Sequence, residues 1–190
     1  MHHKTANYVT FFILLLLVVL GVISYSKANA PFLSFSQDKK TFNNINLELS
    51  FKYPQDFDVR ETKADKITYI DVFPKSLSDQ FEPKFIEIIA MPSDSNAALD
   101  QVVMDSYPDL KKNDLIKLRK FDAEGVQIVQ TQNIAERFIL SYLRFDKMVY
   151  LVKFYQKYYS PDNPYSVVNN SSSLSDYYGI LNSMVFTKIQ

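Results

Sequence analysis

Apolar and polar residues alternate over several short stretches after residue 44, and this period of two predicts a β-sheet. The clearest stretch covers residues 45–53, in which every second side chain is apolar. Residues 66–73 and 84–91 predict two more strands, and each is followed at once by a proline, Pro74 or Pro92. Further strands are predicted at residues 114–121, 126–131, 137–144, 148–155 and 184–187.

The apolar spacing changes to that of a helix in two places. After Pro92, residues 93–96 offer side-chain oxygens suited to a helix N-cap, and apolar residues then recur at helical spacing until Pro108. A second helix is predicted at residues 174–184, after a loop at residues 160–173 that is rich in Asn, Ser and Pro. Each helix has one apolar face, so we expect the helices to cover the sheet.

The stretch at residues 8–25 differs from the rest because it contains no charged side chain. As a helix these residues would extend roughly 27 Å, which is close to the thickness of a bilayer core. The sequence therefore predicts one transmembrane helix in an N-terminal segment at residues 1–30. A tether at residues 31–44, whose last residues begin the fold, leads to a domain at residues 45–190.

A cleaved secretory signal is the alternative for residues 1–30, because Ala28-Asn29-Ala30 has the small-x-small form of a cleavage site. Pro31 argues against cleavage after Ala30, since proline has a fixed φ and lacks the backbone N–H. We expect a single-pass protein of the cell membrane with an extracytoplasmic C-terminal domain, and a secreted form is the alternative. Lysines on both sides of the segment do not fix its orientation, so a domain that faces the cytoplasm also stays open.

Composition excludes several classes of function. The chain has 21 basic and 21 acidic residues, so it presents no net positive charge for a nucleic acid. It has three glycines, too widely separated for a glycine-rich phosphate loop. It has no cysteine, and its histidines are His2 and His3, so the predicted domain lacks the ligands of common zinc, haem and iron–sulfur sites and the bases of Ser-His and Cys-His catalysis.

The order of these elements, together with two short motifs, resembles the PsbP-like family. The motifs are Tyr53-Pro54-x-x-Phe57 after the first strand and the closing segment at residues 180–186. The family includes the extrinsic PsbP protein of photosystem II and many membrane-anchored prokaryotic proteins. It usually has Trp where Phe57 stands and Phe where Met184 stands, so this chain departs from both signatures.

The resemblance implies an α+β fold in which a mostly antiparallel sheet lies between helices, the PsbP-like α/β/α sandwich. It also implies a role in binding or assembly rather than catalysis, and it carries over no active site. We therefore predict no catalytic residue, no cofactor and no metal site.

Four tyrosines flank the predicted loop at residues 160–173 and are candidate anchors of an interface, because exposed tyrosines are frequent in protein interfaces. They are Tyr155, Tyr158, Tyr159 and Tyr165. Tyrosine is also favoured in strands, so a purely structural role is the alternative.

Two overlapping sequons, Asn169-Asn170-Ser171 and Asn170-Ser171-Ser172, lie in the same loop and make Asn169 and Asn170 candidate glycosylation sites in a cell that glycosylates exported proteins.

These observations predict a membrane-anchored, extracytoplasmic binding or assembly module that is not an enzyme. Its expected partners are the membrane, through residues 8–25, and another protein. A carrier or sensor of a small ligand or cation is the alternative, and it requires a pocket in which carboxylates converge.

Overall fold

The computed structural model describes most of the predicted domain. The described residues are 38–80, 83–94, 96–118, 123–133, 135–160, 163 and 165–188. The predicted transmembrane helix at residues 8–25 lies outside them. In the part of the chain that the structure describes, no helix is both long enough and apolar enough to cross a membrane.

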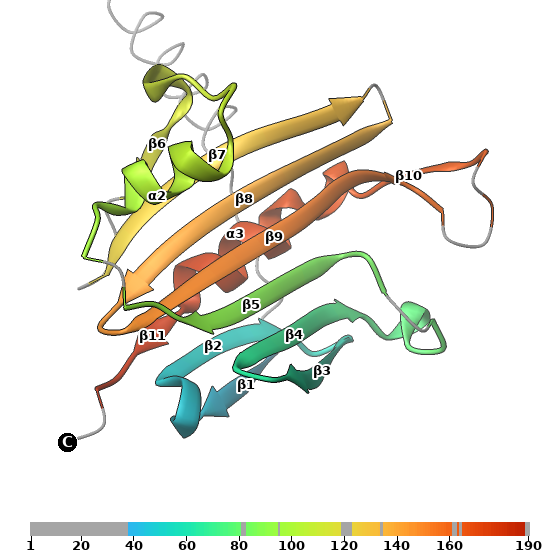
Figure 1. Ribbon diagram of the computed structural model, residues 1–190. Coiled ribbons are helices and arrows are strands. Elements are labelled where there is room, and N and C mark those ends of the chain that lie inside the picture. The colour runs from blue at the N-terminus through green and yellow to red at the C-terminus, as the bar shows by residue number, and fades with distance from the viewer. Residues whose placement is uncertain are drawn as a thin grey trace, which may run out of the picture. The chain divides into compact units, whose positions relative to one another are not determined.

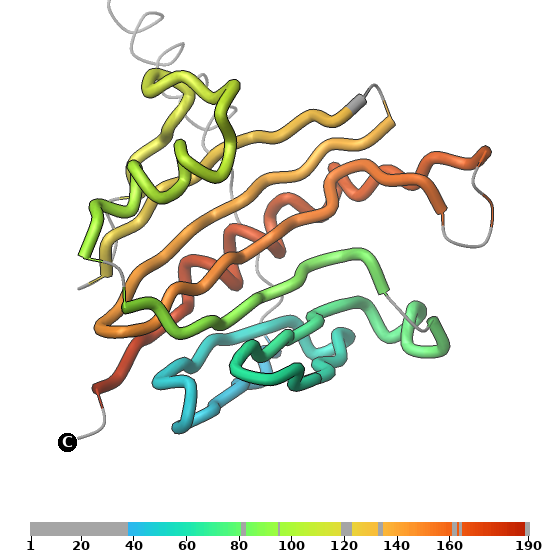
Figure 2. Tube along the Cα trace, in the orientation of Figure 1, coloured from blue at the N-terminus to red at the C-terminus, as the bar shows by residue number. Residues whose placement is uncertain are grey.

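The main sheet has eight strands, and each pairing between described strands is antiparallel (Figure 1). Seven strands follow one another across it in the order β3 (Phe57–Ala64), β4 (Ile67–Pro74), β5 (Ile86–Pro92), β9 (Met148–Tyr159), β8 (Glu136–Phe145), β7 (Glu124–Asn133) and β6 (Ile116–Leu118). The eighth, β10 (Val167–Asn169), returns along the end of β9 (Figure 2). The prediction of a mostly antiparallel sheet is confirmed.

Among the described residues, a smaller sheet has three strands in the order β1 (Lys39–Asn44), β2 (Leu49–Pro54) and β11 (Val185–Phe186). The last residues of the predicted tether thus begin the fold as β1. Residues 45–53 do not form one strand, because Ile45–Leu47 is a 3-10 turn. The Asn44 side chain accepts a hydrogen bond from the Leu47 N–H, and Glu48 has a left-handed φ of 51°, so the chain turns before β2 starts.

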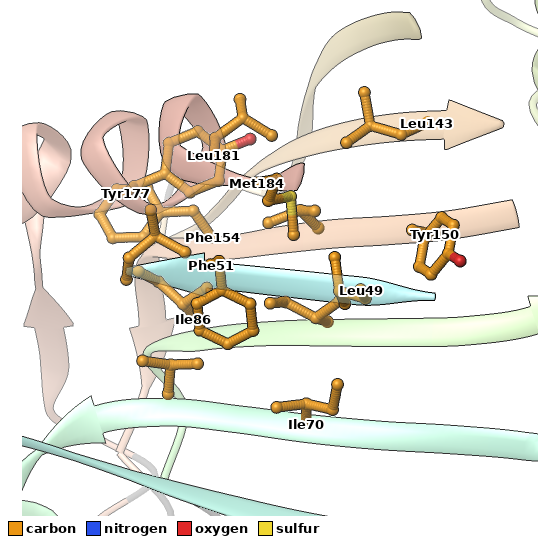
Figure 3. Packing of buried hydrophobic residues seen from close by; sticks show 14 of the residues in the cluster. Leu49, Phe51, Ile70, Ile86, Leu143, Tyr150, Phe154, Tyr177, Leu181 and Met184 are labelled. Carbon is orange, nitrogen blue, oxygen red and sulfur yellow. The ribbon is translucent and has the colours of Figure 1, made fainter. Parts of the chain in front are cut away.

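Helix α3 (Leu174–Ser183) and the small sheet cover one face of the main sheet, which we call the inner face. Figure 1 shows α3 behind β8 and β9. Tyr177 of α3 stacks on Phe154 of β9 with a centroid distance of 5.2 Å, and Phe51 and Leu49 of β2 complete the cluster in Figure 3. This is the larger core of the domain.

A buried network of polar side chains links α3 to the main sheet. The Ser141 and Tyr177 hydroxyls lie 2.6 Å apart, and the Gln127 side-chain amide donates to Ser141 Oγ at 2.7 Å. Burial raises the pKa of the Tyr177 hydroxyl, so Tyr177 stays neutral. Because these buried groups satisfy one another, they tie α3 to β7 and β8.

Helix α2 (Leu99–Ser106) packs on the opposite, outer face. Its Leu99 and Val103 contact apolar residues of β7 and β8. The sequence neighbours of these strand residues point to the inner face, so the contacted residues point to the outer face. A helix therefore lies on each face of the sheet, in agreement with the predicted sandwich.

The N-cap predicted for α2 at residues 93–96 is wrong. Ala98 holds the cap position and has no capping side chain. Instead Glu124 Oε1, from the start of β7, accepts a hydrogen bond of 3.0 Å from the Leu99 N–H. Arg144 Nη1 lies 3.6 Å from Glu124 Oε2 and donates to the Ala97 carbonyl at 2.5 Å. The start of α2 is thus fixed by residues from two distant strands.

Candidate functional site

The outer face of the main sheet carries an open hollow of about 440 Å³ over β3, β4 and β5. Helix α2 packs on β7 and β8, so it leaves this part of the face uncovered. We call the site the outer hollow, and the residues that line it are Arg60, Thr62, Tyr69, Asp71, Pro83, Lys84, Glu87 and Tyr155.

Strand register explains why charged side chains meet there. Arg60 on β3 lies opposite Asp71 on β4, and Asp71 lies opposite Glu87 on β5. Glu87 in turn lies opposite Lys153 on β9. These four residues form a transverse row of cation, anion, anion and cation across one face of the sheet, since directly opposite residues share a face.

The two cations at the ends of the row also contact groups outside it. The Arg60 guanidinium donates to the carbonyls of Ser78 and Gln80 at 3.1 and 3.2 Å, and it lies 5.2 Å from the centre of the Phe73 ring. The Lys153 ammonium lies over the ring of Tyr155 at 4.4 Å and over the ring of Phe138 at 4.7 Å. Cation–π contacts of this kind stabilise partly buried charges.

Burial and neighbouring charges both act on the Lys153 ammonium. Burial lowers the pKa of Lys153, the Lys84 charge adds to this effect, and Glu87 and Glu136 oppose it. The Tyr155 hydroxyl donates to Glu87 Oε2 at 3.1 Å, which fixes the carboxylate at the wall of the outer hollow. The row thus stabilises the sheet and also presents charges of both signs to solvent.

This arrangement is suited to binding polar groups by charge-assisted hydrogen bonds. The described residues include no histidine or cysteine, and they contain no group of three or more His, Cys, Asp or Glu side chains that could hold a metal ion.

The four predicted interface tyrosines lie in different environments. Tyr155 lines the outer hollow, and Tyr158 is 4% exposed and contacts the Tyr155 ring edge-on at 6.0 Å. Tyr159 is 40% exposed, and Tyr165, between β9 and β10, is 95% exposed. The structure therefore brings Tyr155 and Tyr158 together and leaves Tyr165 fully open to solvent.

The two candidate glycosylation sites differ in accessibility. The Asn170 amide is half-buried and donates to the carbonyls of Tyr155 at 2.9 Å and Lys84 at 3.4 Å. Asn169 is exposed, and its side-chain oxygen accepts from the N–H and hydroxyl of Ser171, the third residue of its own sequon. Of the two, Asn169 has the more exposed side chain.

Sequence reasoning named one lining residue of the outer hollow, Tyr155, and missed the others, although the chain contains a signal for two of those. Asp71 and Glu87 are single acids inside otherwise apolar strands, which places both on a face opposite the core. Their direct opposition depends on register between strands, which the pattern of one strand does not give.

Comparisons with known proteins give structural likenesses but no match to a family model or a curated protein. The solution structure of cyanobacterial PsbP (CyanoP) from Synechocystis sp. PCC 6803 is similar, with a TM-score of 0.48 and 10% sequence identity, over 78% of this chain and 92% of that chain. This likeness agrees with the resemblance to the PsbP-like family predicted from the sequence, and we take nothing about function from it.

Proposed function

We propose that this chain is a membrane-anchored, extracytoplasmic binding module without catalytic activity, and that it recognises a protein partner through the outer hollow. Residues 8–25 serve as the single-pass anchor in this proposal, and residues 31–38 link the anchor to the domain. A secreted form released after Ala30 is the alternative.

One observation carries the proposal: the part of the outer face that α2 leaves open is a charged hollow with tyrosines in its wall. Arginine and tyrosine are enriched in protein interfaces, because they combine a large contact area with hydrogen-bonding groups. Arg60 and Tyr155 are already held in place by contacts within the domain. Binding of a partner would therefore cost little of their side-chain conformational entropy.

A small-ligand carrier is the second candidate. Its support is the size of the outer hollow, which falls within the range of about 300–1,000 Å³ usual for ligand sites, and the presence of two opposed carboxylates, Asp71 and Glu87. Its walls are more charged than those of most ligand sites, and for that reason we favour a protein partner.

Photocrosslinking in native membranes tests the binding surface. A photoreactive residue in place of Thr62, which lines the outer hollow, is expected to give one reproducible protein adduct. Glu87→Gln keeps an acceptor for the Tyr155 hydroxyl but removes the charge, and it is expected to lower the adduct yield by roughly tenfold.

The matched control places the same photoreactive residue at Lys52, which is exposed on the small sheet. An equal set of adducts from Thr62 and Lys52 would contradict a partner site at the outer hollow. Loss of the adduct on addition of a small-molecule extract would favour the ligand carrier instead.

The anchor has its own test. Intact-mass measurement of the protein from carbonate-washed membranes is expected to show that residues 8–25 are retained, because a chain that spans the bilayer resists extraction. A mature chain that begins at Pro31 would contradict the anchor and establish the secreted form.

A further inference from the structure

The edge of β7 that points away from β8 is paired over only part of its length. Strand β6 pairs with Gly125, Val126 and Gln127 of β7, whereas β8 occupies the opposite side as far as Asn133. Beyond Gln127, no described strand pairs with this edge of β7. Figure 1 shows no labelled element beside this part of the strand. We call residues 128–132 the open edge.

The two edges of the main sheet differ in how they are protected. Strand β3 forms the other edge and carries alternating charges, Asp58, Arg60, Glu61 and Lys63. Charged edge residues of this kind prevent sheets from pairing with one another. The open edge has the sequence Ile-Val-Gln-Thr-Gln, which contains neither a charge nor a proline. Only one of these two edges thus carries the usual protection.

A hollow borders the open edge. A hollow of about 330 Å³ lies between residues 128–131 and the turn at residues 106–110 that follows α2. Val129 is 42% exposed beside it, although it is a large apolar residue. Pairing of β7 with β8 is regular up to Thr131, so the backbone of residues 128–131 is a regular strand, and the register shifts only at Gln132, the last residue of the open edge.

We propose that the open edge pairs antiparallel with the same edge of a second copy of this chain, so that the two eight-stranded sheets become continuous. A two-fold axis near Gln130 sets Val129 of one copy opposite Thr131 of the other, and β-branched pairs are favourable in sheets. Because the open edge is uncharged, self-pairing brings no like charges together. This proposal does not depend on the outer hollow.

The area that two strand edges bury is small, so the pairing is expected to be weak in dilute solution. Anchors in one membrane would hold two copies at a high effective concentration and make weak pairing sufficient. The test therefore uses the full chain in its membrane.

Because the chain has no cysteine, single cysteines report on this pairing without background. The variants Val129→Cys, Gln130→Cys, Thr131→Cys and Gln132→Cys are each oxidised mildly in membranes. A two-fold antiparallel pair predicts a maximum of disulfide-linked dimer at one position, or at two adjacent ones, because only residues at the axis reach the Cα separation of about 4.4–6.8 Å that a disulfide needs. Lys63→Cys on the β3 edge is the matched control and is expected to give little dimer.

A second experiment places a charge on the open edge. Thr131→Lys, combined with Gln130→Cys, is expected to lower the dimer yield by at least about tenfold, because two lysines would lie beside the axis. Ala64→Lys on β3 is expected to change nothing, and circular dichroism of both variants checks that they fold. Equal dimer yields at all positions, or adducts with other proteins alone, would overturn pairing with a second copy.

Discussion

Replacing Tyr177 with alanine is expected to lower the free energy of unfolding by about 3–5 kcal/mol, the range measured when large aromatic side chains are removed from cores. Tyr177 is fully buried and stacks on Phe154, at the point where α3, the small sheet and the main sheet meet (Figure 3). A loss of this size is a large part of the 5–15 kcal/mol typical of a single domain. Urea denaturation followed by circular dichroism measures it.

Tyr177→Phe separates the hydroxyl from the ring. It removes only the oxygen that bonds to Ser141 and Gln127, and the expected cost is about 1–2 kcal/mol, because those buried groups lose one partner but keep each other. Tyr165→Ala is the surface control, since Tyr165 is 95% exposed, and it should stay within about 0.5 kcal/mol of the native value. If the phenylalanine variant lost as much as the alanine variant, the hydroxyl rather than the stacked ring would hold α3.

Replacing Glu124 with alanine is expected to cost about 2 kcal/mol. The change removes the acceptor for the Leu99 N–H, which caps α2, and such caps contribute about 0.5–2 kcal/mol. It also leaves Arg144 without its counter-charge. The Arg144 side chain is only 14% exposed, and its Nε and Nη2 have no hydrogen-bond partner among the described residues, so its charge depends on this carboxylate. The midpoint of urea denaturation reports the change.

A double-mutant cycle with Arg144→Met tests whether the two side chains act together. A coupling of about 1 kcal/mol is expected, below the value for fully buried pairs because Glu124 is 47% exposed. Glu124→Gln keeps an acceptor for Leu99 and should retain about half of the stability that alanine loses. Additive single mutants would show that Glu124 acts only as a helix cap.

The sequence was a good guide where one element carries its own pattern. Strands β4 and β5 were predicted because each is a short, mostly apolar run closed by a proline, and α2 and α3 because their apolar spacing changes to the helical period. Strand β3 was missed as a strand, because half of its residues are charged and half are exposed, which is typical of an edge strand.

Contacts between distant elements could not be predicted. The cap on α2 comes from Glu124, 25 residues away from Leu99. In β9 an extra residue, Gln156, lies between the partners of Arg137 and Phe138, and this bulge puts Tyr155 and Tyr158 in contact. Alternation along the chain predicts opposite faces for these two tyrosines, so the pattern alone gives the wrong arrangement. The outer hollow depends in the same way on register across four strands.

Strand β2 lies between β1 and β11, so an early part of the domain is completed by its last strand. Ser50 pairs with both Asn43 and Val185, and Met184, fully buried beside them, comes just before β11. A ribosome releases β2 long before β11, and chains with many such long-range contacts fold slowly. We expect the domain to stay unfolded on the ribosome until β11 has emerged, which would suit the export that we propose for it.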